Sequence, residues 1–114
     1  MRKLKILFFV LTIIVTLFGC ESGREKYNKN INQVIKLENE ELQKHGEENL
    51  KRKNTQIIVY EDGKYIELIY NTFSGDKVDR VYRLNKDEAY EEIKEVGKEL
   101  DYKKTDYTEN VGLK

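Results

Sequence analysis

The stretch TQIIVYEDGKYIELIY, residues 55–70, carries the clearest local signal of structure in the chain. Two runs rich in β-branched and aromatic residues flank the turn sequence Glu61-Asp62-Gly63-Lys64. Asp-Gly at the centre of a two-residue loop accommodates the positive φ angles of a type I′ turn, so the stretch predicts a β-hairpin. The turn also sets the register, and the pairs expected to lie opposite each other are Tyr60–Tyr65, Val59–Ile66 and Ile57–Leu68.

The two faces of this hairpin differ, because successive side chains of a strand point to opposite sides. One face is apolar and is expected to receive a helix; it consists of Ile57, Val59, Ile66, Leu68 and Tyr70. The other face mixes apolar, aromatic and acidic side chains; it consists of Ile58, Tyr60, Tyr65, Glu67 and Ile69. An apolar strip with a charged rim is typical of protein–protein contacts, and Tyr suits them well. We expect this second face to be an interaction surface; the alternative is that Tyr60 and Tyr65 only cover the sheet.

The sequence on both sides of the hairpin predicts an α+β domain. Apolar residues at helical spacing indicate an N-terminal helix over about 24–45, with His45 at its C-terminal end as a capping or half-buried residue. Alternation predicts a third strand over 77–84, and residues 102–108 are weakly strand-like. Asn85-Lys86-Asp87-Glu88 reads as a capping box and predicts a second helix near the C-terminus. We therefore expect helices on one face of an antiparallel sheet of three to four strands.

The first nineteen residues have the order of a secretory signal peptide. Arg2, Lys3 and Lys5 give a positive start, and the apolar run over residues 6–18 has the length of an h-region. This run is short for a membrane span, which needs about 20 apolar residues. Leu17-Phe18-Gly19-Cys20 then resembles the lipobox of bacterial lipoproteins, in which signal peptidase II cuts before a Cys that carries a diacylglyceryl group. The alternative is a spare thiol beside a plain signal peptide.

These features divide the chain into three parts. Residues 1–19 are the expected signal peptide, residues 20–23 are the lipidated Cys20 with a short tether, and residues 24–114 are the folded domain. The extended tether spans roughly 10 Å, so the domain should lie close to the membrane. Removal of the signal peptide takes three of the 21 basic side chains and leaves a net charge of −3. We expect two partners, the membrane through the lipid on Cys20 and an envelope or membrane protein, and no nucleic acid.

Candidates for catalysis are few. Cys20 is consumed by lipid in the expected mature form, and one histidine cannot supply the clustered ligands of a transition-metal site. The glycines are scattered, acidic residues such as Glu38, Glu40 and Glu41 read as a solvated helix face, and Lys51-Arg52-Lys53 reads as a solvated loop. We expect no enzymatic activity, no metal and no cofactor. The alternative is a small surface hydrolase or ligand-binding protein that uses a pocket between helix and sheet.

Three motifs together resemble a known group of proteins. They are the lipobox, a helix that begins near Lys26-Tyr27-Asn28-Lys29 and contains Val34-Ile35-Lys36-Leu37-Glu38, and the hairpin sequence Val59-Tyr60-Glu61-Asp62-Gly63-Lys64-Tyr65. The combination is similar to small Gram-positive lipoproteins with a cystatin-like fold, catalogued as a domain of unknown function and often encoded on mobile elements. The resemblance covers about residues 17–84 and implies a helix wrapped by a curved antiparallel sheet. It suggests a role in conjugation or surface exclusion. The chain lacks the Gln-x-Val-x-Gly and Pro-Trp motifs of inhibitory cystatins.

Overall fold

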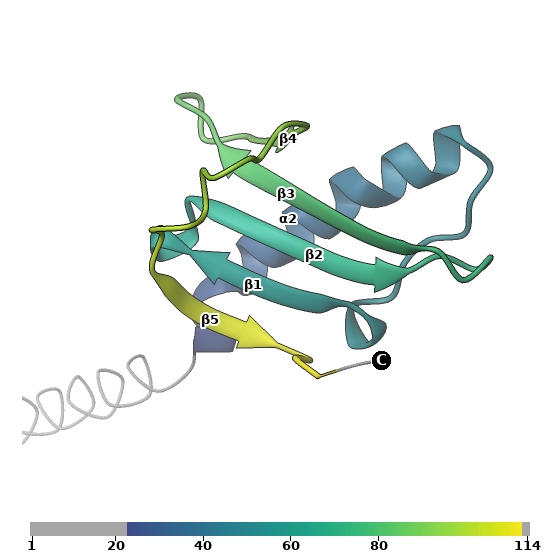
Figure 1. Ribbon diagram of the computed structural model, residues 1–114, viewed down its shortest axis with the longest axis horizontal. Coiled ribbons are helices and arrows are strands. Elements are labelled where there is room, and N and C mark those ends of the chain that lie inside the picture. The colour runs from purple at the N-terminus through teal and green to yellow at the C-terminus, as the bar shows by residue number, and fades with distance from the viewer. Residues whose placement is uncertain (1–22, 113–114) are drawn as a thin grey trace, which may run out of the picture.

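The fold is built from one long helix and an antiparallel sheet that lies against it (Figure 1). The structure is a computed structural model that describes residues 23–112. Within this range the helix is α2 (Gly23–Lys44), and the strands are β1 (Gln56–Tyr60), β2 (Tyr65–Asn71), β3 (Lys77–Leu84), β4 (Tyr90–Ile93) and β5 (Thr105–Glu109). Two short 3-10 helices, η1 (Arg52–Asn54) and η2 (Glu61–Gly63), precede and follow β1. The strands form one sheet in the order β4-β3-β2-β1-β5.

The core lies between α2 and one face of the sheet. Buried residues of α2 recur every three or four positions, as an amphipathic helix requires; they are Tyr27, Ile31, Val34, Glu38 and Leu42. The face of the hairpin that was expected to receive a helix is also buried, and its members are Ile57, Val59, Ile66, Leu68 and Tyr70. The predicted N-terminal helix is therefore confirmed within one residue at each end, and so is the face that it covers.

The hairpin has the predicted register but a different turn. All three predicted pairs of facing residues occur between β1 and β2, so the register is confirmed. The prediction of a two-residue type I′ loop is wrong. Instead, η2 and Lys64 form a four-residue link in which Glu61, Asp62 and Gly63 all have positive φ. Gly63 is buried against α2, where an added Cβ would lie 3.4 Å from Asn30 Nδ2. The conformation of the turn is therefore coupled to its contact with α2.

The capping box predicts a second helix near the C-terminus, and this prediction is wrong. Residues 85–104 form a tight turn, β4 and an irregular connection, so the described part has one α-helix and five strands. The predicted arrangement had two helices and three to four strands. Asn85 Oδ1 accepts hydrogen bonds from the N–H groups of Asp87 (2.9 Å) and Ala89 (3.1 Å), and Asn85 N–H donates to Ala89 O (2.8 Å). The capping chemistry of Asn85 therefore closes a β-turn instead of starting a helix.

Tyr90 explains why the segment after this turn is extended. It pairs with Leu84 across the sheet and buries its ring in the core. Its hydroxyl donates to the carbonyl oxygen of Gly63 and accepts a hydrogen bond from Asn30 Nδ2 (2.9 Å). These partners come from distant parts of the chain, and together they fix β4 at the edge of the sheet.

The C-terminal strand β5 is clamped to the opposite edge by Arg52. The weak strand prediction for residues 102–108 is confirmed from Thr105 onward, because β5 pairs with β1, whereas residues 102–104 belong to the preceding connection. Arg52 Nε lies 2.7 Å from Glu109 Oε2, and Nη2 lies 2.8 Å from Oε1. The two side chains are only 18% and 11% exposed, so the solvated-loop interpretation is wrong for Arg52. The guanidinium holds the pKa of Glu109 below its ordinary value.

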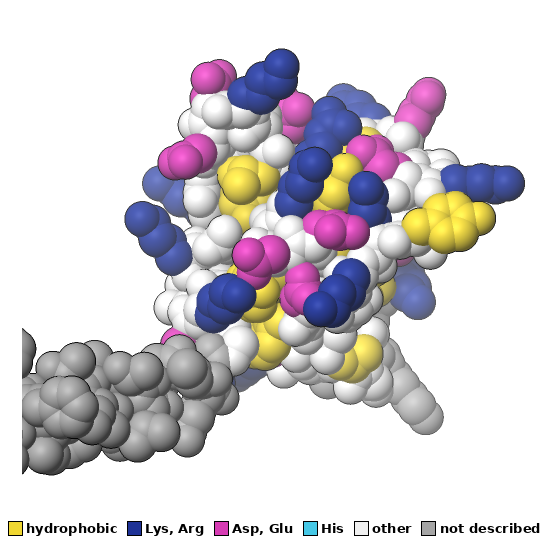
Figure 2. Space-filling view, turned by 90° about the vertical axis from the view of Figure 1, so that its left-hand side faces the viewer, with side chains coloured by type: hydrophobic (Ala, Val, Ile, Leu, Met, Phe, Trp, Pro, Cys, Tyr) yellow, Lys and Arg dark blue, Asp and Glu magenta, His cyan; other side chains and the backbone are white. Residues whose placement is uncertain are grey.

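Charges of both signs cover the end of the domain where η2 and the β4–β5 connection lie. Figure 2 looks at this end and shows Lys and Arg side chains among Asp and Glu, with small hydrophobic patches between them. Lys26 Nζ lies 2.7 Å from Asp62 Oδ1, and Lys104 Nζ lies 3.6 Å from Asp106 Oδ1. Because the lysines are exposed, such pairs stabilise the fold only slightly.

Arg52→Ala should lower the free energy of unfolding by about 3 kcal/mol, because the largely buried Glu109 carboxylate keeps the hydrogen bond from Tyr107 but loses the guanidinium that neutralises it. Urea denaturation followed by circular dichroism measures this loss. The matched control is Lys44→Ala, which breaks an exposed pair with Glu41 (3.1 Å) and should cost at most about 0.5 kcal/mol. Equal losses in the two variants would contradict the clamping role of Arg52.

Candidate functional site

The outer face of the sheet, opposite α2, holds the predicted interaction surface. Figure 1 shows this face in front, with α2 behind the sheet. Ile58, Tyr60, Glu67 and Ile69 are each partly exposed there, and Ile58 lies directly opposite Glu67. Tyr60 Oη donates a hydrogen bond to Glu67 Oε1 (2.7 Å), which orders both side chains. We call these four residues the open strip.

Tyr65, the fifth residue predicted for this surface, is placed differently. It is only 4% exposed because the β4–β5 connection covers it. Its hydroxyl donates to Glu99 Oε1 (3.1 Å), and the ammonium groups of Lys64 and Lys103 lie 5.9 and 5.5 Å from its ring centroid. Glu99 also pairs with Arg83 (3.1 Å). Tyr65 therefore belongs to a small cluster that fastens the connection to the sheet.

Glu67 is the titratable group of the open strip. Its burial raises the pKa of its carboxyl to about 7, and the neighbouring carboxyl of Asp79 acts in the same direction. The hydrogen bond from Tyr60 opposes this shift, while burial and that same bond raise the pKa of Tyr60. The strip is therefore partly neutral near pH 7 and gains negative charge as the pH rises.

On the opposite side of the sheet, a carboxylate is buried between α2 and the central strands. Glu38 is only 2% exposed, so its assignment to a solvated helix face is wrong. Its Oε1 accepts a hydrogen bond from Tyr82 Oη (2.6 Å), and its Oε2 accepts one from Tyr70 Oη. Burial first, and then the bond to this carboxylate, raises the pKa of both tyrosine hydroxyls.

Arg80 connects the buried carboxylate with the surface. Its Nε lies 3.6 Å from Glu38 Oε2 and 3.7 Å from Glu92 Oε1 on β4. Because the side chain of Arg80 is 47% exposed, it brings a positive charge to the edge of the core without being buried itself. A buried acid thus has two hydroxyl donors and one guanidinium, which satisfies the requirement that buried charge be paired.

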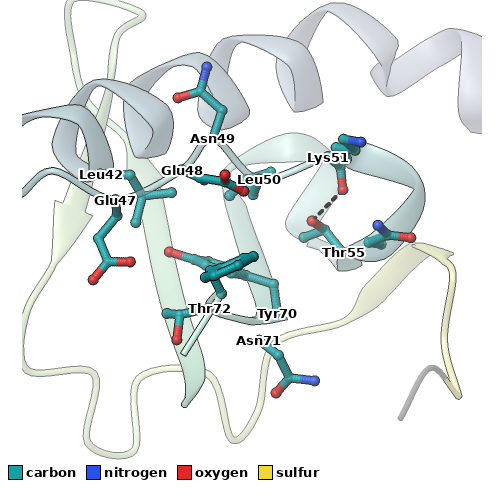
Figure 3. Close-up of a pocket in the computed structure, with 12 residues that line it drawn as sticks. Leu42, Glu47, Glu48, Asn49, Leu50, Lys51, Thr55, Tyr70, Asn71 and Thr72 are labelled. Atoms are coloured by element: carbon teal, nitrogen blue, oxygen red, sulfur yellow. Dashed lines mark hydrogen bonds between the residues drawn. The ribbon is translucent and has the colours of Figure 1, made fainter. Parts of the chain in front are cut away.

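A hollow of about 260 Å³ lies beside this cluster, between the segment after α2 and the end of β2 (Figure 3). Figure 3 shows Glu48 and Leu50 on one side of it and Tyr70 and Thr72 on the other. Thr55 Oγ1 donates to the carbonyl oxygen of Lys51 (2.8 Å) and steadies the loop. The Tyr70 hydroxyl is already bonded to Glu38, so the hollow offers mainly carboxylates and amides at its rim.

A second hollow, of about 610 Å³, lies on the other side of the cluster between α2, β3 and β4. Acidic and basic side chains line it together, among them Glu40, His45, Arg80 and Glu92. His45 is exposed at the end of α2. The helix–sheet interface itself is filled by core side chains, so both hollows lie at its margins rather than between its layers.

The remaining predicted residues concern lipidation. Leu17, Phe18, Gly19 and Cys20 lie outside the described residues, so the lipobox assignment stays a prediction from the sequence. Within residues 23–112, no group of three or more His, Cys, Asp or Glu side chains is arranged to hold a metal ion. In that same range, none of the helices combines the length and the apolar character that crossing a membrane requires.

The sequence predicts that Glu38 and Arg52 are exposed to solvent, whereas the structure buries most of both side chains. Glu38 lies seven positions after Ile31 and four after Val34, which is the spacing of the buried face of α2. The helical period could therefore have identified Glu38, had its charge not argued against burial. Arg52 offers no such signal, because Glu109 is 57 positions away.

One solved structure has a similar fold. It is the crystal structure of a DUF4467 family protein from Staphylococcus aureus subsp. aureus Mu50, with a TM-score of 0.65 and 25% sequence identity. The match covers 75% of this chain and 98% of that chain. No family model matches the chain, and no curated protein matches it. The resemblance to a domain-of-unknown-function family from a Gram-positive bacterium is therefore supported, while the lipid anchor and the cystatin-like relationship rest on the sequence.

Glu38→Ala should lower the free energy of unfolding by about 3 kcal/mol or more, because two buried tyrosine hydroxyls lose their acceptor. Glu40→Ala, two positions along on the exposed face of α2, is the matched control and should change it by at most about 0.5 kcal/mol. Urea denaturation of both variants makes the comparison. If Glu38→Ala were as stable as the control, the carboxylate would not fasten the helix to the sheet.

The free energy of unfolding should fall as the pH rises from about 5 to about 8, on the order of 1 kcal/mol from Glu67 alone. In this window the folded state binds the Glu67 proton, because its pKa is raised to about 7, whereas the unfolded chain has released it. Glu67→Gln cannot titrate and should flatten this part of the profile. Chemical denaturation at a series of pH values tests the difference, and parallel profiles for the two proteins would exclude Glu67 as its source.

Proposed function

We propose that this protein is a membrane-anchored extracellular lipoprotein whose domain is a non-enzymatic interaction module for an envelope or membrane-proximal protein. The observation that supports the proposal is the difference in burial between the two faces of the sheet. One face is buried in the core. On the other face, the residues of the open strip, Ile58, Tyr60, Glu67 and Ile69, are partly exposed. A surface of this composition suits protein recognition.

The anchor part of the proposal rests on the order of features near the N-terminus. A basic start, an apolar run and Leu17-Phe18-Gly19-Cys20 follow one another as in a lipoprotein precursor. A lipidated Cys20 with two acyl chains would hold the domain stably, where one chain would not. The resemblance to lipoproteins of mobile elements suggests conjugation or surface exclusion as the biological setting.

The open strip has properties that favour binding over simple coverage of the sheet. Tyr60 is held by its hydrogen bond to Glu67, so a partner that packs on its ring loses little side-chain entropy. Glu67 and the exposed Asp79 give the strip a negative rim, to which a basic group of the partner would be complementary. We therefore expect a partner surface that combines an apolar patch with Lys or Arg.

Replacing Ile69 with a photo-cross-linking amino acid should yield a specific adduct with one envelope protein in intact cells. The same replacement at Phe73, which is 86% exposed in the β2–β3 turn, is the matched control and should not yield that adduct. Tyr60→Ala should then weaken capture of the identified protein at least about tenfold, because aromatic anchors contribute strongly to such contacts.

Two further measurements decide between the possible outcomes. A thermal melt of Tyr60→Ala should show that the domain remains folded, and unchanged capture by that folded variant would contradict the assigned surface. Cys20→Ala should abolish labelling of the protein with palmitate, and persistent labelling would contradict the anchor. The anchor and the surface are thus tested separately.

A further inference from the structure

We infer that the end of the domain next to Cys20 is a seat for anionic lipid headgroups, with Lys64, Tyr102 and Lys103 as its contact residues. The inference rests on the proposed lipid anchor and adds to it an orientation of the domain on the membrane. It concerns residues other than those of the open strip, because Lys64 and Lys103 flank Tyr65, which the β4–β5 connection covers at one end of the outer face.

The path of the chain places this end within reach of the bilayer. α2 begins at Gly23, three residues after Cys20, and three extended residues span roughly 10 Å. Tyr27, in the second turn of α2, donates a hydrogen bond from its hydroxyl to Asp62 Oδ1 (2.9 Å) in η2. The η2 turn, and Lys64 directly after it, therefore lie beside the start of the helix (Figure 1).

The β4–β5 connection is fastened to the same end. Glu61 N–H donates to the carbonyl oxygen of Lys104 (2.9 Å), and Asp62 N–H donates to Asp106 Oδ2 (2.5 Å). Lys103 reaches over the ring of Tyr65, the first residue of β2. Tyr102, its neighbour, is 94% exposed. Residues that are far apart in the sequence thus form one surface next to the anchor.

The lysines of this surface fall into two kinds. Lys26 and Lys104 lie against the carboxylates of Asp62 and Asp106, which neutralise them. Lys64 and Lys103 instead flank the aromatic ring of Tyr65, at 5.9 and 5.5 Å from its centroid. An ammonium beside an aromatic ring keeps its full charge, so this second pair is suited to bind a phosphate from outside the protein.

The chemistry of these residues matches a bilayer surface better than a free anion. Tyr concentrates at membrane–water interfaces, where its ring meets the headgroups and its hydroxyl meets water, so the exposed Tyr102 has a natural place there. Attraction between Lys and an anionic leaflet fades over a Debye length of about 8 Å at physiological salt. The tether reaches roughly 10 Å, so it allows the start of α2, and the η2 turn beside it, to approach the bilayer closely. Acidic side chains on the same end limit the attraction to close contact (Figure 2).

Energy transfer in reconstituted vesicles tests the orientation. The lipidated mature protein carries a fluorophore on Ser74→Cys, in the β2–β3 turn at the far end of the domain, and the headgroups carry the acceptor. In vesicles of equimolar phosphatidylcholine and phosphatidylglycerol, the domain should contact the headgroups through Lys64, Tyr102 and Lys103. This orientation keeps the fluorophore far from the acceptors. Lys64→Gln with Lys103→Gln should release the domain and raise transfer about twofold, to the level found in pure phosphatidylcholine.

The matched control removes two lysines from the far end, Lys53→Gln with Lys77→Gln, and should leave transfer unchanged. Equal transfer in both double variants would overturn the inference, as would equal transfer in the two kinds of vesicle. Normal orientation combined with lost capture of the cellular partner in the Lys64/Lys103 variant would also overturn it, because the end would then bind protein. Failure of lipidation is detected separately by vesicle flotation, because a protein without lipid on Cys20 does not float with vesicles.

Discussion

The buried carboxylate of Glu38 determines how the helix lies on the sheet. Apolar contacts have no direction, and a helix with an apolar stripe could slide along the strands with little loss of buried area. A buried charge without partners would cost several kcal/mol, so the only acceptable position is one in which Tyr70, Tyr82 and Arg80 all reach Glu38. These partners come from the two central strands, β2 and β3, and therefore align the helix with both at once.

The alignment of α2 on the sheet determines how the other parts of the domain are placed. Because α2 occupies one face of the sheet, the outer face is left partly exposed, although Tyr65 and Val81 on that face are buried. At the far edge, Arg52 attaches β5 through Glu109 and donates to Asn28 and Asn32 on α2. The same side chain thus joins the last described strand to α2.

The sequence predicts those parts whose determinants are local. The register of the hairpin follows from alternation and from one turn, and the limits of α2 follow from a helical period. The second helix fails because the side chain of Asn85 satisfies a β-turn as readily as a helix start, and the choice depends on Tyr90 reaching Gly63 and Asn30. Tyr65 looked available for the same reason: the residue that covers it, Glu99, lies 34 positions further along the chain. Long-range partners of this kind leave no periodic trace in a single sequence.

The arrangement also limits where a partner can be. In the proposed lipoprotein, a tether of roughly 10 Å would join the lipid on Cys20 to α2, whose 22 residues span about 33 Å. The open strip begins at Tyr60, one residue before the η2 turn beside the start of α2, and runs along β2 to Ile69, roughly 13 Å away. With the proposed anchor, the Tyr60 end of the strip would be the part nearest the membrane. A long polar tether would let the strip move far from the bilayer, whereas the proposed short tether would hold it in a layer next to the bilayer. Under this proposal, a protein that contacts the strip would be embedded in the membrane or would extend down to its surface.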